Sequence, residues 1–252
     1  IQVNAFDEPQ SAQSFADVAA KIKATNPQMI IGPLYPQHFG DMTQLSKQLP
    51  DVKWVIPFSS KYEDLKTTSN VFLLNAPIEQ KAQIVASLFA KTFKGAKAVF
   101  LHEGNGNEII FSAAMRNALS QGGFDIVDLP AGYSADQLKA LANGKKMVVF
   151  IPETSEENGV KNMIDKIKSL RQEYPKGRFA LMAYPDWLDL PSISRRDLFD
   201  IDTYVFNNHF YNPYSVDTQK KVDEYSTWFK TRPLETSPRM FLLGYDAGIR
   251  LM

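Results

Sequence analysis

Short apolar runs alternate with stretches of helical periodicity along most of this chain. Two runs establish the pattern, residues 29–39 (MIIGPLYPQHF) and residues 52–60 (VKWVIPFSS), and each stops abruptly at proline, small residues and hydroxyls. Apolar runs of this length, rich in β-branched residues and separated by a helical pattern, are typical of buried parallel strands. Open parallel sheets bind ligands just past the carboxyl ends of their strands. Tyr35, Ser59 and Ser60 fall at such positions, although the two serines could equally cap a helix that begins near residue 61.

The same pattern predicts eight or nine strands with helices between them. The strands are expected near residues 2–6, 28–32, 53–57, 71–74, 96–101, 125–129, 146–151, 178–183 and 203–207. Helices are expected near 15–22, 38–48, 78–93, 108–121, 135–142, 156–172, 216–231 and 238–252. Ser134 with Gln137, and Thr154 with Glu157, have capping-box spacing, and Ser237-Pro238 has the composition of a helix start.

Strands that alternate with helices are the signature of an α/β fold. The segments 71–77 and 207–215 are expected to be crossings between two sheets, so the prediction is two Rossmann-like lobes with a cleft between them. The second crossing is rich in aromatic residues with polar tips and begins at Asn207. Such residues suit a ligand wall, a protein interface or packing between lobes. Tyr184 and Asp186 directly follow the strand at 178–183, where Asp186 could meet a cationic group.

Composition excludes several classes of function. The 28 basic residues balance 28 acidic ones, so no overall field attracts nucleic acid or an anionic membrane. The chain has no cysteine, which removes disulfides, cysteine-bound metals and thiol nucleophiles. No apolar run approaches the roughly 20 residues that span a bilayer. The chain begins within an expected strand and ends within an expected helix that has no cap. It is therefore expected to be a fragment, and a targeting signal is expected to lie outside it.

Catalytic and cofactor motifs are weak. Gly104-Asn105-Gly106-Asn107 follows a strand and precedes a helix, as a dinucleotide fingerprint does, but its sixth position is Ile109. A tight turn explains it as well, and the helix start could still hold a carboxylate or phosphate. His38, His102 and His209 lack a metal-ligand spacing, and His102 is expected to be structural or part of a pocket wall. No nucleophile elbow or zinc-protease motif occurs, so we expect no enzyme, no metal and no cofactor.

Four segments carry a resemblance to a known family: IIGPLY (30–35), WVIPFSS (54–60), 71–103 (VFLLNAPIEQKAQIVASLFAKTFKGAKAVFLHE) and GYDAG (244–248). In order and spacing they resemble the type I periplasmic binding proteins, the leucine/isoleucine/valine-binding-like receptors of ABC importers. The resemblance implies two lobes joined by three crossings, with residues 1–73 plus 208–252 in one and 76–206 in the other. It also implies a periplasmic or cell-envelope location.

The resemblance also implies the binding residues. In the first lobe, Ser59 and Ser60 keep part of the hydroxyl-rich loops with which the family binds its ligand. The other loop reads Tyr35-Pro36, so it has no Ser or Thr there, and Pro36 has no backbone N–H to donate. In the second lobe Asn107 and Thr154 occupy binding positions, and Asp186 would be the acidic partner of an ammonium group.

Two main hypotheses follow. The first is a non-catalytic module that holds a small polar ligand, with an ABC permease as a partner. The second is an envelope interaction domain with a degenerate site, as in similar lipoproteins linked to peptidoglycan. A third, a nucleotide-using enzyme at the Gly104–Asn107 turn, is kept for testing.

Overall fold

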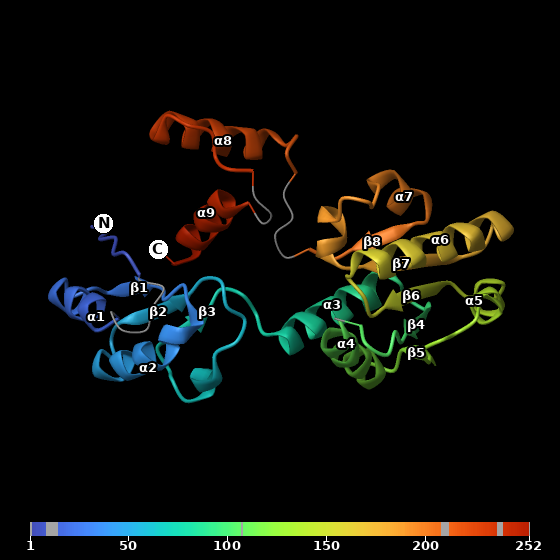
Figure 1. Cartoon of the computed structure of the whole chain (residues 1–252), viewed down its shortest axis with the longest axis horizontal. Helices are drawn as coiled ribbons and strands as arrows, with labels where there is room; N and C mark the ends of the chain where they lie inside the picture. The colour runs from blue at the N-terminus through green and yellow to red at the C-terminus, as the bar shows by residue number, and fades with distance from the viewer. Residues whose placement is uncertain (1, 9–14, 107, 208–211, 236–238, 252) are drawn as a thin grey trace. The chain divides into compact units, whose positions relative to one another are not determined.

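The computed structural model describes residues 2–8, 15–106, 108–207, 212–235 and 239–251 (Figure 1). The chain divides into two compact units, Ile1–Lys81 and Ala82–Met252. Each unit contains its own sheet, of three and of five strands, and every strand pairing is parallel. The predicted α/β architecture with two parallel sheets is therefore confirmed. Among the described residues no helix is both long and apolar enough to span a membrane.

The first unit is built on the sheet β1 (Met29–Ile31), β2 (Lys53–Ile56) and β3 (Val71–Leu73), in that order. Its helices are α1 (Phe15–Ala24) and α2 (Phe39–Gln48), with 3-10 turns η2 (Pro36–His38) and η3 (Glu63–Lys66). One core joins these elements, because apolar residues of α1, α2 and η3 pack against alternate residues of the strands. Its buried members are Phe15, Met42, Leu45, Val52, Trp54, Ile56, Tyr62 and Val71.

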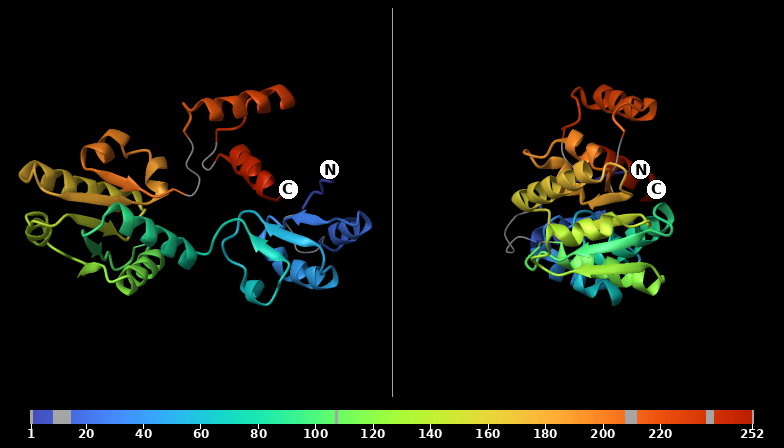
Figure 2. Two further views of the ribbon diagram at one scale, coloured as in Figure 1. Left: turned by 180° about the vertical axis from the view of Figure 1, so that it is seen from behind. Right: turned by 90° about the vertical axis from the view of Figure 1, so that its right-hand side faces the viewer.

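The second unit contains the sheet in the order β5-β4-β6-β7-β8. Its strands are β4 (Lys97–Leu101), β5 (Asp125–Leu129), β6 (Val148–Pro152), β7 (Phe179–Ala183) and β8 (Thr203–Val205). The helices around it are α3 (Ile78–Thr92), α4 (Ile109–Gln121), α5 (Ala135–Ala142), α6 (Glu157–Glu173) and α7 (Arg195–Asp200), with the 3-10 turn η4 (Pro185–Asp189). In Figure 2, α3 and α4 lie on one side of this sheet and α6 and α7 on the other.

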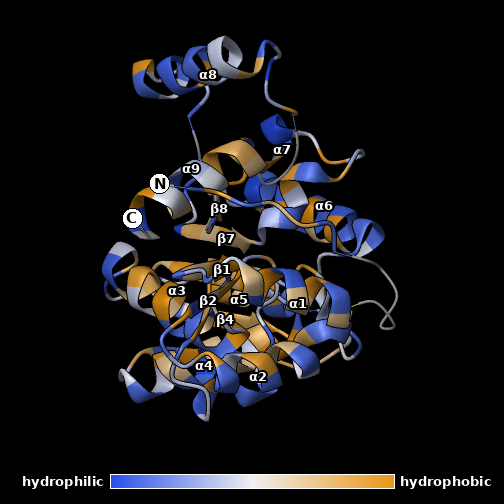
Figure 3. Ribbon diagram, turned by 90° about the vertical axis from the view of Figure 1, so that its left-hand side faces the viewer, coloured by the Kyte–Doolittle hydropathy of each residue, from blue (hydrophilic) through white to orange (hydrophobic). Residues whose placement is uncertain are grey.

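The buried strands explain why the sequence shows continuous apolar runs. Every residue of β6 and β7 is buried, and so are all residues of β4 after Lys97. Helices on both faces of a parallel sheet leave no solvent-facing side, so alternation with polar residues is lost. Figure 3 shows β7 in the hydrophobic colours. This packing fixes the carboxyl ends of β4, β6 and β7 beside one another.

The last two helices are α8 (Val216–Phe229) and α9 (Met240–Leu251). They contact each other through Tyr225 and Phe241, whose ring centroids are 5.4 Å apart, and Lys221 lies over the ring of Tyr245. The assignment of 208–252 to one lobe with 1–73, and of 76–206 to the other, stays a prediction.

Two local predictions were wrong. Residues 2–8 form no strand; the Glu8 carboxylate instead accepts hydrogen bonds from the amides of Leu34 and Tyr35. The capping box at Thr154 is also absent, because α6 begins at Glu157 and the Glu156 side chain accepts from Gly159 N–H. The box predicted at Ser134 and Gln137 is present in full. Ser237-Pro238 lies outside the described residues.

Candidate functional site

The last residue of β6 and the three polar residues after it join the carboxyl ends of β4, β6 and β7 in the second unit. We call these four residues, Pro152–Ser155, the hub segment. The buried Tyr184, after β7, donates its hydroxyl to the Pro152 carbonyl at 2.7 Å. Trp187 donates its indole N–H to the Thr154 carbonyl at 2.9 Å. Both donors are fully desolvated, so these bonds hold the loop after β7 firmly against the hub segment.

Glu153, in the middle of the hub segment, binds the loop after β4. Its side chain is almost fully buried, and one carboxylate oxygen lies 2.8 Å from His102 Nδ1. The other accepts the backbone N–H of Glu103 at 3.3 Å. A buried carboxylate is expensive unless it is paired and hydrogen-bonded, and these contacts meet that requirement. Glu153 therefore connects β6 to the end of its neighbour β4.

His102 links this carboxylate to a second one. Its Nε2 lies 3.1 Å from Asp128 of β5, and Asp128 also receives two-pronged hydrogen bonds from Arg116 of α4. Both ring nitrogens face carboxylate oxygens, so the protonated imidazole can donate to both, whereas a neutral ring can donate to only one. Partial burial lowers the pKa of His102, but the hydrogen bonds and charges of Asp128 and Glu153 outweigh it and raise the pKa above its ordinary value. Arg116 is the main cause that lowers the pKa of Asp128.

This arrangement lacks the properties of a catalytic dyad. A histidine that acts as a general base needs a ring nitrogen with a free lone pair, and both nitrogens here are occupied by carboxylates. Four side chains of alternating charge instead contact one another in series and connect α4, β5, β4 and β6. In order of contact they are Arg116, Asp128, His102 and Glu153. His102 thus has the structural role that its position at a strand end predicts.

The glycines of the turn after β4 are explained by packing. A Cβ on Gly106 would lie 2.0 Å from the Glu153 carbonyl oxygen, so only glycine fits there. Gly104 has φ of +76°, a conformation that glycine adopts most easily. Glu108 then donates its backbone N–H to the same Glu153 carbonyl at 3.1 Å. The turn is therefore shaped to contact the hub segment, which accounts for both glycines without a nucleotide.

The Glu108 carboxyl is held at this edge and is influenced by the charge of Asp186. Ser155 of the hub segment donates its hydroxyl to Glu108 Oε1 at 2.8 Å. Burial raises the pKa of Glu108, the bond from Ser155 lowers it, and the negative charge of Asp186 raises it again, with a net upward shift. Asp186 itself is exposed. A partly buried acid beside an exposed one is the arrangement that a cationic group would stabilise.

The predicted residues of the second unit are divided between buried and exposed positions. Tyr184 and Thr154 are buried, and Thr154 Oγ1 accepts the Glu156 N–H at 3.2 Å. Asn105 and Asn207 are exposed at the ends of β4 and β8. Asn107 lies outside the described residues, as do His209, Phe210 and Tyr211. The hub segment brings Thr154, Tyr184 and the Glu108–Asp186 pair into one region.

In the first unit, the predicted residues follow β1 and β2. Tyr35 is half-buried and donates its backbone N–H to Glu8 at 3.2 Å. Ser59 Oγ accepts the Lys61 N–H and donates to the Lys61 carbonyl, so it closes a local turn and caps no helix. Ser60 is half-buried beside it. The expected helix near 61 is only the turn η3, and the residue that precedes it, Tyr62, gives no side-chain cap.

Sequence reasoning missed Glu153 and Glu108, which connect most of these contacts. One signal could have found Glu153: a charged residue that directly follows an unbroken apolar strand is buried only when it has partners. The described residues contain no group of three or more His, Asp or Glu side chains placed to hold a metal ion.

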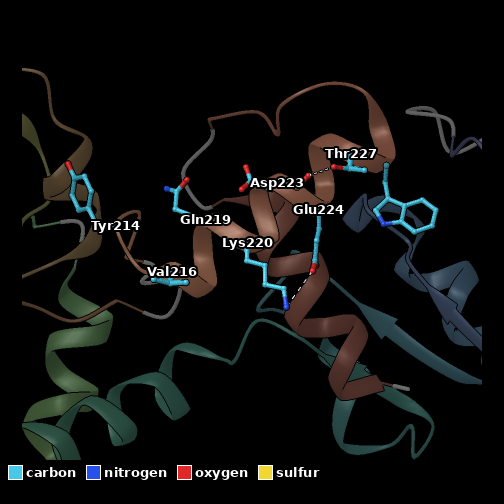
Figure 4. A pocket seen from close by; sticks show the side chains of 8 residues that line it. Tyr214, Val216, Gln219, Lys220, Asp223, Glu224 and Thr227 are labelled. Carbon is cyan, nitrogen blue, oxygen red and sulfur yellow. Dashed lines mark hydrogen bonds and ion pairs between the residues drawn. The ribbon is translucent and has the colours of Figure 1, made fainter.

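A groove of about 640 Å³ lies on α8 (Figure 4). Its lining consists of Tyr214, Val216, Gln219, Lys220, Asp223, Glu224, Thr227 and Trp228. All of these belong to one helix and the residues just before it, so the groove is an open helix surface. Within α8, Lys220 and Glu224 form an exposed ion pair at 4.0 Å. We do not assign it to the site.

No protein-family model matches the sequence, and no curated protein does. Solved structures do match. An ABC transporter substrate-binding protein from Desulfitobacterium hafniense is 16% identical with a TM-score of 0.55, over 95% of this chain and 68% of that one. A structure of an ABC transporter substrate-binding protein from the same organism in complex with Leu is 19% identical with a TM-score of 0.52, over 98% and 70%.

LpoA from Haemophilus influenzae also matches, at 14% identity with a TM-score of 0.58, over 93% of this chain. The match spans only 41% of LpoA. Identities this low establish the fold and leave the function open. Two parallel sheets flanked by helices, with these neighbours, show that the chain has the fold of the type I periplasmic binding proteins.

Proposed function

We propose that the chain is a non-catalytic binding module of the cell envelope that holds a small polar ligand at the strand-end loops. The observation that carries the proposal is the Glu108 carboxyl, which Ser155 holds at the carboxyl edge of the five-stranded sheet and whose pKa is raised by burial and by the charge of Asp186. In parallel sheets this edge is where ligands bind. A ligand with an ammonium or other cationic group would relieve the repulsion between the two acids. Asn105, after β4, and Asn207, after β8, would add hydrogen bonds from two strands of this sheet. Tyr35, Ser59 and Ser60 are the corresponding candidates on the smaller sheet.

The neighbours support this proposal at the level of the fold. One of them was solved with leucine, a ligand that carries an ammonium group. By analogy, this chain would lie in the periplasm or envelope and would work with an ABC permease.

The test is a thermal-shift screen of the protein against amino acids, short peptides, sugars and muropeptides, with L-leucine as the first probe. A ligand at about 100 times its Kd adds about 2.7 kcal/mol to the free energy of unfolding. For a chain of this size that corresponds to about 5–10 °C. Glu108→Gln and Asp186→Asn should abolish the shift, whereas the control Asp200→Asn, on the exposed face of α7, should preserve it. No shift with any compound would refute the proposal.

A second candidate function is an envelope interaction domain whose ligand site is degenerate. The observation that favours it is that Tyr184 and Trp187 donate their polar hydrogens to the hub segment, while the Thr154 hydroxyl accepts a bond from its own loop. LpoA, an envelope lipoprotein, shares the fold over nearly the whole chain. On this alternative the partners are peptidoglycan-associated proteins. Co-sedimentation with purified peptidoglycan sacculi, together with a silent thermal screen, would favour it over solute binding.

A further inference from the structure

The turn after β4 contacts a single residue at both of its ends. Glu153 accepts the Glu103 N–H with its side chain, and its carbonyl accepts the Glu108 N–H. Between these two bonds, Gly106 packs directly against the Glu153 backbone. The position of the Glu108 carboxyl therefore depends on where Glu153 is held. Apart from Glu103, the group that holds the Glu153 side chain among the described residues is His102.

The charges around His102 come from several elements. Asp128 of β5 and Glu153 after β6 face its ring directly, and Arg116 of α4 faces Asp128 from the other side. Glu103 follows His102 in the chain and accepts a hydrogen bond from the Tyr133 hydroxyl at 3.2 Å. The ring is thus the positive link between two negative groups.

Loss of the proton from His102 would affect its two partners unequally. A neutral imidazole can donate from only one nitrogen, so one carboxylate would face a lone pair. Asp128 would keep its bonds to Arg116 and is about one-third exposed to water. Glu153 is 2% exposed and has only one other contact, the longer one to the Glu103 amide, so the neutral ring would keep its remaining proton on Nδ1, toward Glu153. The positive charge that offsets this buried carboxylate would still be lost, so the bond that holds Glu153 and the turn would weaken.

We propose that His102 is a positioning residue that, while protonated, fastens the turn 103–106 and Glu108 to the end of β6 through Glu153. The consequence for a ligand, that it binds best when His102 is protonated, rests on the proposed function. The fastening itself is a property of the unliganded protein and can be measured without any ligand.

The experiment follows amide-exchange protection at Glu103 and Glu108 by NMR between about pH 5 and pH 9, with the histidine signals titrated in parallel. Protection at both amides should fall by about tenfold as His102 loses its proton, since the positive charge that strengthens the bond to Glu153 is lost. In His102→Gln, protection at the two amides should be lower and should not change with pH over the range in which His102 titrates. In Glu153→Gln, protection should likewise not depend on pH. Lys139→Gln, which removes an exposed ion pair between α5 and α6, is the control and should leave the profile intact.

An unchanged pH profile in His102→Gln would overturn the proposal, and so would a loss of protection that occurs only together with global unfolding. If the profile behaves as expected but no compound shifts the melting temperature, the fastening stands and the proposed function fails. If a ligand binds with equal affinity on both sides of the titration, the fastening does not control binding and that part of the proposal is refuted.

Discussion

Gly106→Ala tests the packing of the turn against the hub segment. The added Cβ would lie 2.0 Å from the Glu153 carbonyl oxygen, 2.8 Å from its carbonyl carbon and 2.9 Å from its Cβ. The oxygen would have to withdraw by about 1 Å to restore even the 3.0 Å that real Cβ atoms respect. Two of the three obstructing atoms are backbone, so a rotamer change cannot make room for the methyl group.

The expected cost follows from overpacking and from the bond that the shift would break. Overpacking costs about 1–3 kcal/mol, and loss of the Glu108 N–H bond to Glu153 costs about 1 kcal/mol more. We therefore expect the free energy of unfolding of the second unit to fall by about 2–4 kcal/mol. Gly106 does not have a positive φ, so this loss reports space alone.

Urea unfolding followed by tryptophan fluorescence measures this change through Trp187, which is fully buried beside the hub segment. Trp54→Phe and Trp228→Phe in the parent protein would leave Trp187 as the reporter of this unit. Gly40→Ala in α2 is the matched control, because its added Cβ meets nothing within 4 Å and alanine favours a helix. A decrease below about 1 kcal/mol for Gly106→Ala, with an unchanged m value, would refute the packing argument.

Three further variants or conditions test other parts of the second unit. Tyr184→Phe leaves the Pro152 carbonyl without its buried donor, so urea unfolding should show a loss of about 1–2 kcal/mol, and an unchanged midpoint would contradict the bond. Ser134→Ala removes a complete capping box and should cost about 1 kcal/mol, whereas Ser134→Asp should retain most of the stability in the same assay. The raised pKa of His102 predicts a contribution to stability that is complete below its ordinary value of 6.5 and disappears as the pH rises through the folded value. Melting curves of the parent and His102→Gln should therefore differ most at low pH, and a difference that grows with pH would reverse the assigned sign.

The fold was predictable because local patterns and the global fold agree over most of the chain. β5 and α5 were predicted to the residue, since an apolar run bounded by breakers and a capping box mark their ends. Residues 2–6 have a similar composition but form no strand, because a strand needs a neighbour to pair with its backbone and composition does not show one. α7 has only six residues, too few for a helical period to be visible.

The strand-end loops were predictable and their contacts were not, while the role of these loops in binding stays a prediction. Apolar runs that end in polar loops gave the strand ends, so Thr154, Tyr184 and Asp186 were placed in the correct loops. The bond between His102 and Glu153 joins residues 51 positions apart, and it exists because β6 lies beside β4 in the sheet. Strand order is not encoded in the periodicity of either strand, so no local pattern could have paired them.

The internal bonds of the hub segment constrain the choice between the two proposed functions. Tyr184, Trp187 and Thr154 use their polar atoms to hold loops in place, which preorganises the edge but leaves those atoms unavailable to a ligand. The acidic pair differs, because Glu108 is held by one neutral hydroxyl and its pKa is raised by burial and by Asp186. A cation at this edge would offset the charges of both Glu108 and Asp186, which a purely structural edge does not require. The Glu108–Asp186 pair is therefore the feature that an interaction domain does not need and a cation-binding site does, and the variants of these two residues decide between the functions.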